Sequence, residues 1–331
     1  MARILVTGGC GFIGSHLVEA LVNDGHQVVV VDNLSTGKLE NIEGVSKQVE
    51  FHQVDIRDLS ALMRLTQDID YVYHEAAIGS VPRSLDDPVT TDSVNVGGTL
   101  NVLVAAKESR VRRVVFASSS SVYGDTPALP KLETMLPMPM SPYAASKLAG
   151  EMYMQAFYNS YGLETISLRY FNVFGPRQDP RSEYAAVIPR FILALINGER
   201  PTVFGDGMQS RDFTYVQDIV QANLLAMKAP CTHSEAVNIA CEQAITLNQL
   251  LEMLQEALAR RVEPVYAESR PGDVRHSWAD CSEARRVIGY SPVVSITEGL
   301  RLTCEWFLEK QLRSRPSPEQ DCFGCGVSVG T

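Results

Sequence analysis

The sequence lacks the apolar segments that carry a chain into or across a membrane. No apolar run approaches the roughly 20 residues that a membrane-spanning helix requires. The first residues do not resemble a secretory signal peptide, because Met1, Ala2 and Arg3 lead directly into a strand-like run and a glycine-rich turn. We therefore expect a cytoplasmic protein with no membrane partner.

A disulfide framework and an excess of positive charge are also missing. The seven cysteines are scattered, and the CxxC spacing of Cys322 and Cys325 has no second ligand pair, so we expect no metal site. The formal net charge of −10 argues against nucleic acid as a partner, because phosphate backbones bind to basic faces. This charge still permits one small anionic ligand held by a few arginines.

What the sequence does contain is an alternation of short β-branched runs with longer stretches of helical apolar spacing. The expected strands are residues 4–7, 27–31, 49–54, 71–74, 113–117 and 164–169. The expected helices between them are residues 13–23, 59–66, 94–109 and 141–160. This α/β alternation predicts a Rossmann-type, doubly wound parallel sheet with helices on both faces.

The pattern loosens after Gly175. Residues 176–184 are polar and loop-like, residues 187–197 are helical, and short elements alternate to about residue 312. We expect a first domain over residues 1–175 with later segments interwoven, and a smaller α/β C-terminal lobe over residues 176–312. Residues 313–331 are polar, aperiodic and rich in proline and glycine, which predicts a mobile tail.

The turn after the first predicted strand has the composition of a dinucleotide-binding site. Gly8, Gly11 and Gly14 permit a tight turn, close approach of the backbone to a pyrophosphate, and close packing of the helix that follows. The N-terminus of that helix would present free N–H groups and a positive dipole to the phosphates. The first domain is therefore predicted to bind a dinucleotide.

Acidic residues end the next two strands. A carboxylate at Asp32 would accept hydrogen bonds from the adenosine ribose and repel a 2′-phosphate, and Asn33 rather than an arginine follows it. This pair favours NAD over NADP, although Asp32 could instead be a simple turn residue. Asp55 and Ile56 could meet the adenine, and Asp55 too could serve only in a turn.

A tyrosine and a lysine then stand four residues apart. Tyr143 and Lys147 would share one face of a helix. A phenol with a pKa of about 10 is a poor base, so we expect the lysine and a nicotinamide cation to lower the pKa of Tyr143.

Four serines, at positions 118–121, follow the fifth strand, where open α/β sheets bind ligands. One hydroxyl could hold the substrate oxygen that Tyr143 deprotonates, and two are expected to satisfy only their own backbone.

With these residues in place, the chain resembles the extended short-chain dehydrogenases/reductases. Within them it is similar to UDP-hexose 4-epimerases, with most likeness to UDP-N-acetylglucosamine 4-epimerases. The similarity runs from Ala2 to about Leu312. The motifs that carry it, in family order, are GGCGFIGSH, SSSSVYGD, SPYAASK, RYFNVFGPRQDP, SRDFTYVQDI and RPGDVRHSWAD.

The resemblance implies roles for individual residues. It matches Ser119 to the catalytic hydroxyl residue, Tyr143 to the base and Lys147 to its partner. Besides the glycines and acidic strand ends above, the implied NAD-binding residues are Phe12, Ile13, Ala76, Asn95, Ser118, Tyr143, Lys147 and Tyr170. The implied UDP-sugar residues are Gly79, Ser80, Ser119, Ser120, Tyr143, Asn172, Gln178, Ala186, Arg211, Arg270, Asp273 and Ser277. Two guanidiniums suit a diphosphate, because each can donate two parallel charge-assisted hydrogen bonds.

Missing carboxylates decide between reactions within the family. Related 4,6-dehydratases carry an Asp-Glu pair after the catalytic hydroxyl residue, and decarboxylating relatives carry a Glu at the second of these positions. This chain has Ser120 and Ser121 there. The resemblance therefore implies C4 epimerisation through a transient 4-keto sugar, with NAD staying bound and acting catalytically.

The expected substrate follows from the size of one side chain. Glucose-restricted relatives have a tyrosine where this chain has Ser277, before Trp278, and a hydroxymethyl group leaves room for an N-acetyl group. Gly79-Ser80, Gln178 and Ala186 also resemble the N-acetyl subgroup. UDP-GlcNAc and UDP-GalNAc are therefore the predicted substrates, with UDP-Glc and UDP-Gal also accepted because a roomy pocket rejects smaller ligands poorly.

Two other functions and the assembly stay open at this stage. A UDP-glucuronate 4-epimerase would need a cationic pocket, for which Arg83 or Arg181 could serve. A non-catalytic NAD-binding sensor is the remote alternative, since such proteins usually lose the tyrosine or the lysine. The resemblance implies a homodimer through residues 94–109 and 142–160, although apolar stripes there could equally belong to the core.

Overall fold

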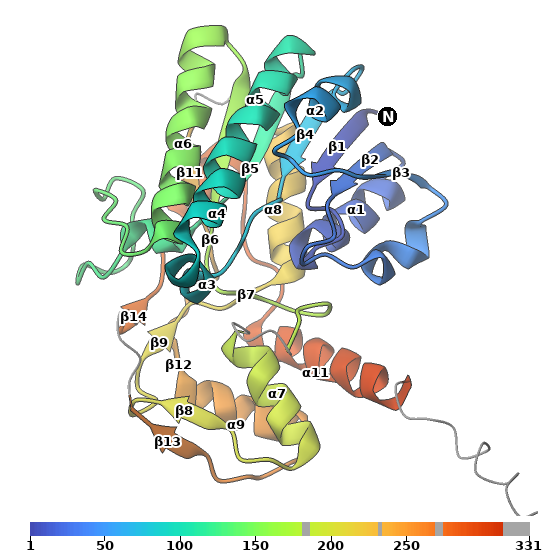
Figure 1. Cartoon of the computed structure of the whole chain (residues 1–331). Coiled ribbons are helices and arrows are strands. Elements are labelled where there is room, and N and C mark those ends of the chain that lie inside the picture. The colour runs from blue at the N-terminus through green and yellow to red at the C-terminus, as the bar shows by residue number, and fades with distance from the viewer. Residues whose placement is uncertain (181–185, 231–233, 269–273, 314–331) are drawn as a thin grey trace, which may run out of the picture.

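The computed structural model describes residues 1–180, 186–230, 234–268 and 274–313 (Figure 1). Its centre is a seven-stranded sheet in the order β11-β6-β5-β4-β1-β2-β3, in which every neighbouring pair is parallel. The strands are β1 (Arg3–Thr7), β2 (Gln27–Asp32), β3 (Val49–Gln53), β4 (Tyr71–His74), β5 (Arg113–Ser119), β6 (Glu164–Tyr170) and β11 (Ala236–Ile239). The predicted doubly wound parallel sheet is confirmed.

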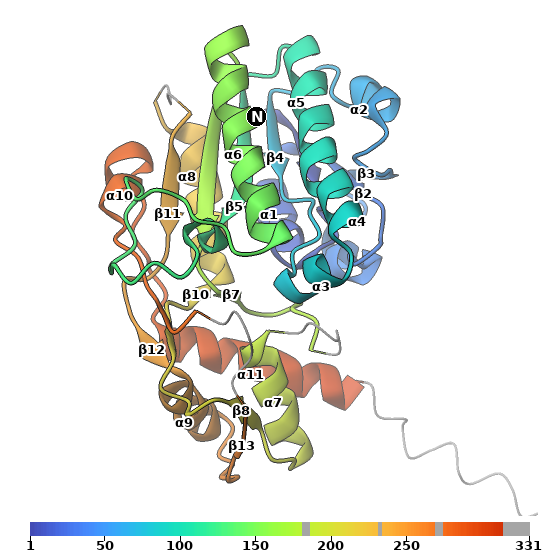
Figure 2. The same cartoon turned by 60° about the vertical axis from the view of Figure 1, so that its left-hand side comes forward.

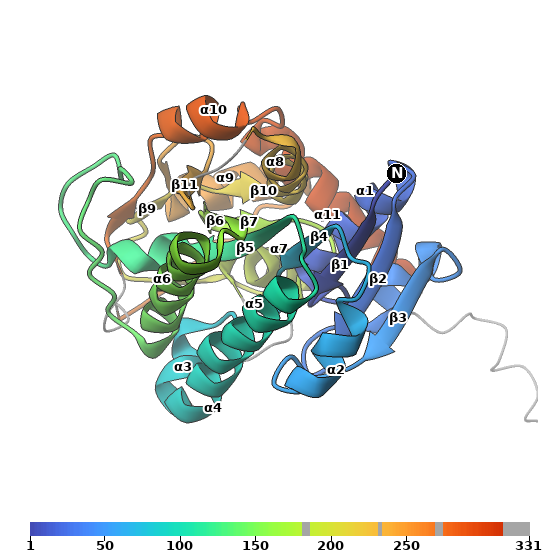
Figure 3. The same ribbon diagram turned by 90° about the horizontal axis from the view of Figure 1, so that it is seen from above.

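Helices cover both faces of this sheet (Figure 3). One face packs against α1 (Phe12–Asn23) and α8 (Val216–Lys228), and the other against α2 (Leu59–Leu65), α5 (Gly98–Glu108) and α6 (Pro142–Tyr161). Strands buried on both faces need apolar residues at successive positions rather than at alternate ones, which accounts for the four consecutive buried valines of β2.

A smaller lobe lies below the carboxyl ends of the strands (Figures 1 and 2). Its core joins α7 (Val187–Asn197), α9 (Leu247–Ala257) and α11 (Ile296–Arg313). Short strands complete it: β8 (Thr202–Phe204) pairs with β13 (Val265–Ala267), and β9 (Ser210–Arg211) lies between β12 (Ile245–Thr246) and β14 (His276–Ser277). Together with the first sheet, this gives the predicted large α/β unit with a smaller α/β lobe.

The chain passes between the two parts more than once. β7 (Val173–Phe174) pairs with β10 (Thr214–Tyr215) at the junction, and α8, β11 and α10 (Ser282–Ile288) then return to the large sheet. The strand predicted over residues 71–74 and the helix predicted over residues 187–197 have those bounds in the structure. The helix predicted over residues 94–109 is a π-helical turn, η2 (Ser93–Gly97), followed by α5.

Sequence periodicity missed four short elements. They are η1 (Leu39–Val45), α3 (Val81–Asp86), α4 (Pro88–Asp92) and η3 (Ser120–Tyr123). Each is too short to repeat an apolar pattern, and side-chain caps begin three of them, α3, α4 and η3. The side chains of Ser80 and Asp87 accept hydrogen bonds at the starts of α3 and α4, where prolines occupy the first turn.

Candidate active site

The glycine-rich turn connects β1 directly to α1. Gly8 has a φ of +69°, and a Cβ there would lie 2.7 Å from the backbone of Ala76, so a larger residue would strain the turn and meet the end of β4. A Cβ on Gly14 would collide with the carbonyl of Gly8. The two glycines therefore bring the N-terminus of α1 against the sheet edge, where Phe12 and Ile13 line the main cavity.

The acidic strand ends make local contacts of their own. Both oxygens of the buried Asp32 carboxylate accept backbone N–H groups, Oδ2 from Cys10 at 3.0 Å and Oδ1 from Leu34 at 2.8 Å. Asp32 thus ties the loop after β2 to the glycine turn, and each oxygen keeps a lone pair for a further donor.

Asp55 holds a second turn together by hydrogen bonds to its carboxylate. It accepts the Asn33 side-chain amide at 2.9 Å and a bidentate hydrogen bond from Arg57, which together hold its pKa well below the ordinary value. The side chain of Ile56 is buried against Gly98. The carbonyl of Ile56 accepts a hydrogen bond from the Asn101 side-chain amide at 3.2 Å.

The predicted catalytic residues converge at the carboxyl edge of the sheet. Ser119 ends β5, Tyr143 lies in the first turn of α6, and the Ser119 side chain is close enough to the phenol to lower its pKa. One turn further along α6, the buried Lys147 ammonium donates to the carbonyl of Ala117 at 2.8 Å and lies 6.0 Å from the centroid of the Tyr143 ring. The structure therefore brings a phenol, a hydroxyl and an ammonium group together as the spacing predicts.

The side chains of the protein alone shift the pKa of Tyr143 upward. The sequence predicts a lowered pKa, but in the structure loss of hydration raises the pKa of Tyr143 more than the hydrogen bond from Ser119 lowers it. A carboxylate on Glu75 opposes the phenolate further. The same loss of hydration lowers the pKa of Lys147 to about 8. The prediction included the positive charge of a bound nicotinamide, so it stays a prediction for the site with its cofactor.

The four serines have separate environments. The Ser118 hydroxyl donates to Glu151 of α6. Ser119 accepts the backbone N–H of Ser121 at 3.2 Å in addition to its contact with Tyr143, and the buried Ser121 hydroxyl has no hydrogen-bond partner among the described residues. Ser120 lines the main cavity. We expected two of the four hydroxyls to hydrogen bond only to nearby backbone groups. The contacts of the four serines do not show two such hydroxyls.

A cavity of about 660 Å³ opens between the large sheet and the smaller lobe. Residues predicted for NAD that line it are Phe12, Ile13, Ser118, Tyr143 and Tyr170. Residues predicted for the UDP-sugar that line it are Gly79, Ser119, Ser120, Tyr143, Asn172, Gln178, Ala186, Arg211 and Ser277. Part of the predicted NAD set and most of the predicted UDP-sugar set therefore face one space.

Other predicted residues are not on the wall of this cavity as the described residues define it: Gly8, Gly11, Gly14, Asp32, Asn33, Asp55, Ile56, Ala76, Ser80, Asn95 and Lys147. Ser80 caps α3 by accepting the N–H of Arg83. The Asn95 amide is occupied by both backbone groups of Ile78 and by Ser146. Ala76 donates its N–H to Thr7 beside the glycine turn. Arg270, Asp273 and Arg181, together with Cys322 and Cys325, lie outside the described residues.

Strand pairing assembles the far side of the cavity. In the register of β14 with β9, Ser277 lies beside Arg211. The Asn172 side chain donates to the carbonyl of Asp212 at 2.9 Å, which joins the chain after β6 to the same strand. Within the described part of the chain, the buried Oε1 atom of Gln178 has no hydrogen-bond partner, so an acceptor is available at this wall.

Sequence reasoning missed Glu75, which follows β4 and accepts a hydrogen bond from Tyr170 at 2.9 Å. Burial raises the pKa of Glu75 to about 7. It also missed Arg190 and Phe204 of the smaller lobe, which line the cavity. The sequence could have indicated Glu75, since burying a carboxylate directly after a buried strand costs free energy unless the group has a partner or a function.

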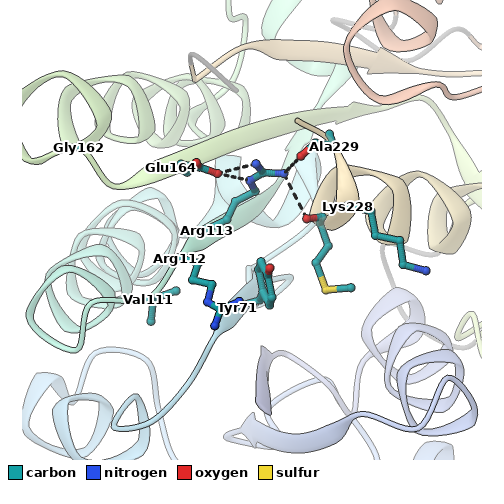
Figure 4. A pocket seen from close by; sticks show the side chains of 9 residues that line it. Tyr71, Val111, Arg112, Arg113, Gly162, Glu164, Lys228 and Ala229 are labelled. Carbon is teal, nitrogen blue, oxygen red and sulfur yellow. Dashed lines mark hydrogen bonds and ion pairs between the residues drawn. The ribbon is translucent and has the colours of Figure 1, made fainter. Parts of the chain in front are cut away.

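A second cavity lies at the opposite, amino-terminal edge of the sheet (Figure 4). The two arginines that line it are paired with other groups of the protein. Arg113 is buried and donates to Glu164 and to the carbonyls of Ala226 and Ala229, and Arg112 pairs with Asp70. This arrangement anchors the end of α8 to β5.

The described residues hold no group of three or more histidine, cysteine, aspartate or glutamate side chains placed to bind a metal ion. In the same part of the chain, no helix combines the length and the apolar character needed to span a bilayer.

Comparison with known proteins gives a consistent result. Residues 4–240 match the model of the NAD dependent epimerase/dehydratase family. A UDP-glucose 4-epimerase of Mycolicibacterium smegmatis is 41% identical over 313 residues, covering 93% of this chain and 99% of the relative.

Two solved structures superimpose closely. The UDP-N-acetylglucosamine 4-epimerase of Methanobrevibacter ruminantium, in complex with UDP-N-acetylmuramic acid, is 42% identical with a TM-score of 0.90, covering 93% of this chain and 99% of that one. The UDP-glucose 4-epimerase of Thermus thermophilus, in complex with NAD, is 40% identical with a TM-score of 0.85, covering 92% and 99%.

Proposed function

The chain belongs to the NAD-dependent epimerase/dehydratase family, and from this premise we propose that it interconverts the C4 epimers of UDP-sugars, with preference for UDP-GlcNAc and UDP-GalNAc. The observation that carries the proposal is the group formed by Ser119 and Tyr143 on the wall of the main cavity and the buried Lys147 behind them. A phenol, a hydroxyl and an ammonium group at one sheet edge suit the removal and return of a hydroxyl proton.

The residues around the glycine turn fit NAD. Gly8 and Gly14 leave no side chain between the N-terminus of α1 and the sheet edge, so backbone N–H groups can approach a pyrophosphate. Asp32 retains lone pairs for ribose hydroxyls, and its hydrogen bonds within the described residues come from backbone N–H groups rather than from a cation that would suit a 2′-phosphate. When bound there, NAD supplies the hydride acceptor and donor for C4 of the sugar.

The protein residues hold and move the proton. Tyr143 takes the proton of the C4 hydroxyl and later returns it, while Ser119 holds the same oxygen. Lys147 places a positive charge beside the phenol, which stabilises its ionised form. The chain has Ser120 and Ser121 where dehydration or decarboxylation would require carboxylates, so the same oxygen is returned to the sugar.

The wall formed by Arg211, Asn172 and Ser277 is proposed to hold the nucleotide and to set the sugar preference. The Arg211 guanidinium suits the diphosphate, and the small Ser277 side chain beside it leaves room at the C2 substituent. For the alternative substrate, UDP-glucuronate, the candidate Arg83 is not among the described residues of the cavity wall. The second candidate, Arg181, lies outside the described residues, so the proposed preference for N-acetyl sugars rests on Ser277.

The test is incubation of the purified protein, without added NAD, with UDP-GlcNAc, UDP-glucose or UDP-glucuronate, followed by NMR of the products. We expect conversion of UDP-GlcNAc to UDP-GalNAc, faster than conversion of UDP-glucose. Turnover of UDP-glucose alone would retain the reaction and overturn the substrate preference. Turnover of UDP-glucuronate alone would favour the alternative, and no turnover even with NAD added would overturn the proposed reaction.

A further inference from the structure

Glu75 occupies a central place beside the glycine turn. It directly follows β4, and its N–H donates to the carbonyl of Thr7 at the end of β1 at 3.2 Å. The next residue, Ala76, is the backbone that Gly8 approaches. In the sheet order, β1 and β4 lie where the strand order reverses, which is where open α/β sheets bind their ligands.

Its carboxylate is held in one orientation by a directed hydrogen-bond chain. The Asn223 side-chain amide donates to the hydroxyl oxygen of Tyr170 at 2.8 Å. Because an amide N–H can only donate, Tyr170 directs its own proton to Glu75 Oε1 at 2.9 Å. Asn223 is fully buried on α8, so this chain runs from the helix layer through β6 to the carboxylate.

Strand register places this carboxylate among ionisable groups from three elements. His74 pairs with Phe116 of β5, so Glu75 follows beside Ala117, whose carbonyl holds the Lys147 ammonium of α6. Tyr170 of β6, which donates to Glu75, pairs with Ser119 at the end of β5, and Tyr73 lies on β4 itself. A negative charge at Glu75 favours the protonated forms of both Tyr143 and Lys147. Lys147 and the hydrogen bond from Tyr170 in turn favour ionised Glu75, while burial opposes it.

We propose that Glu75 is a positioning residue that sets the proton affinity of the Tyr143–Lys147 pair through its charge. Ionised Glu75 holds the proton on Tyr143, and neutral Glu75 lets it leave more readily. The effect acts through Tyr143 and Lys147. The inference rests on the proposed function only in taking Tyr143 as the base.

A purely structural role would be limited to accepting the Tyr170 hydrogen bond. Glu75→Gln distinguishes the structural role from the electrostatic role, because glutamine keeps an acceptor for Tyr170 but carries no charge. The matched control is Glu133→Gln. Glu133 is also a partly buried carboxyl, and it accepts the backbone N–H of Asn238 rather than facing Tyr143.

The experiment is a titration of tyrosinate absorbance in the substrate-free holoenzyme. The contribution of Tyr143 is isolated by subtracting the same protein carrying Tyr143→Phe. We expect Glu75→Gln to lower the midpoint of the Tyr143 titration by about one pH unit, the usual effect of removing a like charge nearby. Glu133→Gln should leave the midpoint unchanged.

An unchanged midpoint in Glu75→Gln, with wild-type circular dichroism and NAD content, would overturn the proposal. Should the glutamine variant fail to fold, Glu75→Met also removes the charge, and the same downward shift is expected. The titration needs no UDP-sugar, so it gives a result even if the proposed reaction is not observed. Where turnover is measured, the acid limb of its pH profile should move to lower pH in Glu75→Gln.

Discussion

At the scale of single residues, the site depends on the different hydration of its side chains. Lys147 is buried, and loss of hydration lowers its pKa to about 8, whereas the pKa of Tyr143 is raised. These opposite directions favour the neutral forms of both groups. Positive charge brought into the cleft by a bound cofactor would favour the phenolate.

Tyr143→Phe tests the proposed base. Phenylalanine preserves the shape of the side chain but cannot take the proton, so we expect the epimerisation rate to fall about a thousandfold, within the usual contribution of general acid–base catalysis. Product formation followed by NMR measures the effect. Tyr161→Phe, at the exposed end of the same helix, is the matched control and should retain full activity.

Ser277→Tyr tests the proposed sugar preference. The phenol ring would fill the space beside Arg211 that is assigned to the N-acetyl group. We expect turnover of UDP-GlcNAc to drop more than about tenfold relative to turnover of UDP-glucose. Both rates are measured in the same variant, so UDP-glucose is the internal control. An equal loss for the two substrates would place the N-acetyl group elsewhere.

At the scale of elements, helix ends are placed by side chains from other segments. Ser141 caps α6 by accepting the N–H of Ala144, and Ser84 of α3 accepts the N–H of Tyr143. At the other sheet edge, Arg113 of β5 donates to the last carbonyls of α8 (Figure 4). A guanidinium satisfies carbonyls that have no partner within their helix and complements the helix dipole.

Arg113→Met is expected to destabilise the protein by about 3 kcal/mol or more. The substitution removes a guanidinium that is only 5% exposed, and it leaves the α8 carbonyls and the partly exposed Glu164 without their donor. Urea denaturation followed by circular dichroism measures the free energy of unfolding. Arg112→Met is the matched control, because Arg112 is largely exposed and its single ion pair contributes little.

At the scale of the whole molecule, the two parts of the fold enclose one cavity, and buried groups connect the layers of the large sheet. The His74 ring hydrogen bonds to Thr7 of β1 at 2.7 Å and to Thr99 of α5 at 2.9 Å. Loss of hydration lowers the pKa of His74 to about 3. The folded protein therefore holds this histidine neutral.

This neutral histidine predicts a pH dependence of stability. Below a pH of about 6.5 the unfolded chain binds a proton at His74 that the folded chain does not, so the contribution of His74 to stability falls as the pH falls. The unfolding free energy of the wild type minus that of His74→Gln should decrease by about 1.4 kcal/mol per pH unit between pH 6 and pH 4. Urea denaturation at several pH values measures it, and a constant difference would contradict neutral burial of His74.

The features that the sequence determined by itself are local ones. The glycine spacing of the first turn, the valine run of β2 and the four-residue step from Tyr143 to Lys147 each specify a conformation or a shared face through neighbouring residues. Their physical basis is backbone sterics and the helix and strand periods, which hold in any context. The parallel sheet and the position of its ligand edge follow from the same alternation.

Only the tertiary structure decided what depends on contacts between distant segments. The pairing of β14 with β9 places Ser277 beside Arg211, and β11 and α8 return to the large sheet from late in the chain. The charge environment of Tyr143 on α6 likewise depends on Glu75, which follows β4 in a distant part of the chain. Hydration and electrostatic coupling depend on what surrounds a group in space, and sequence spacing contains no measure of either.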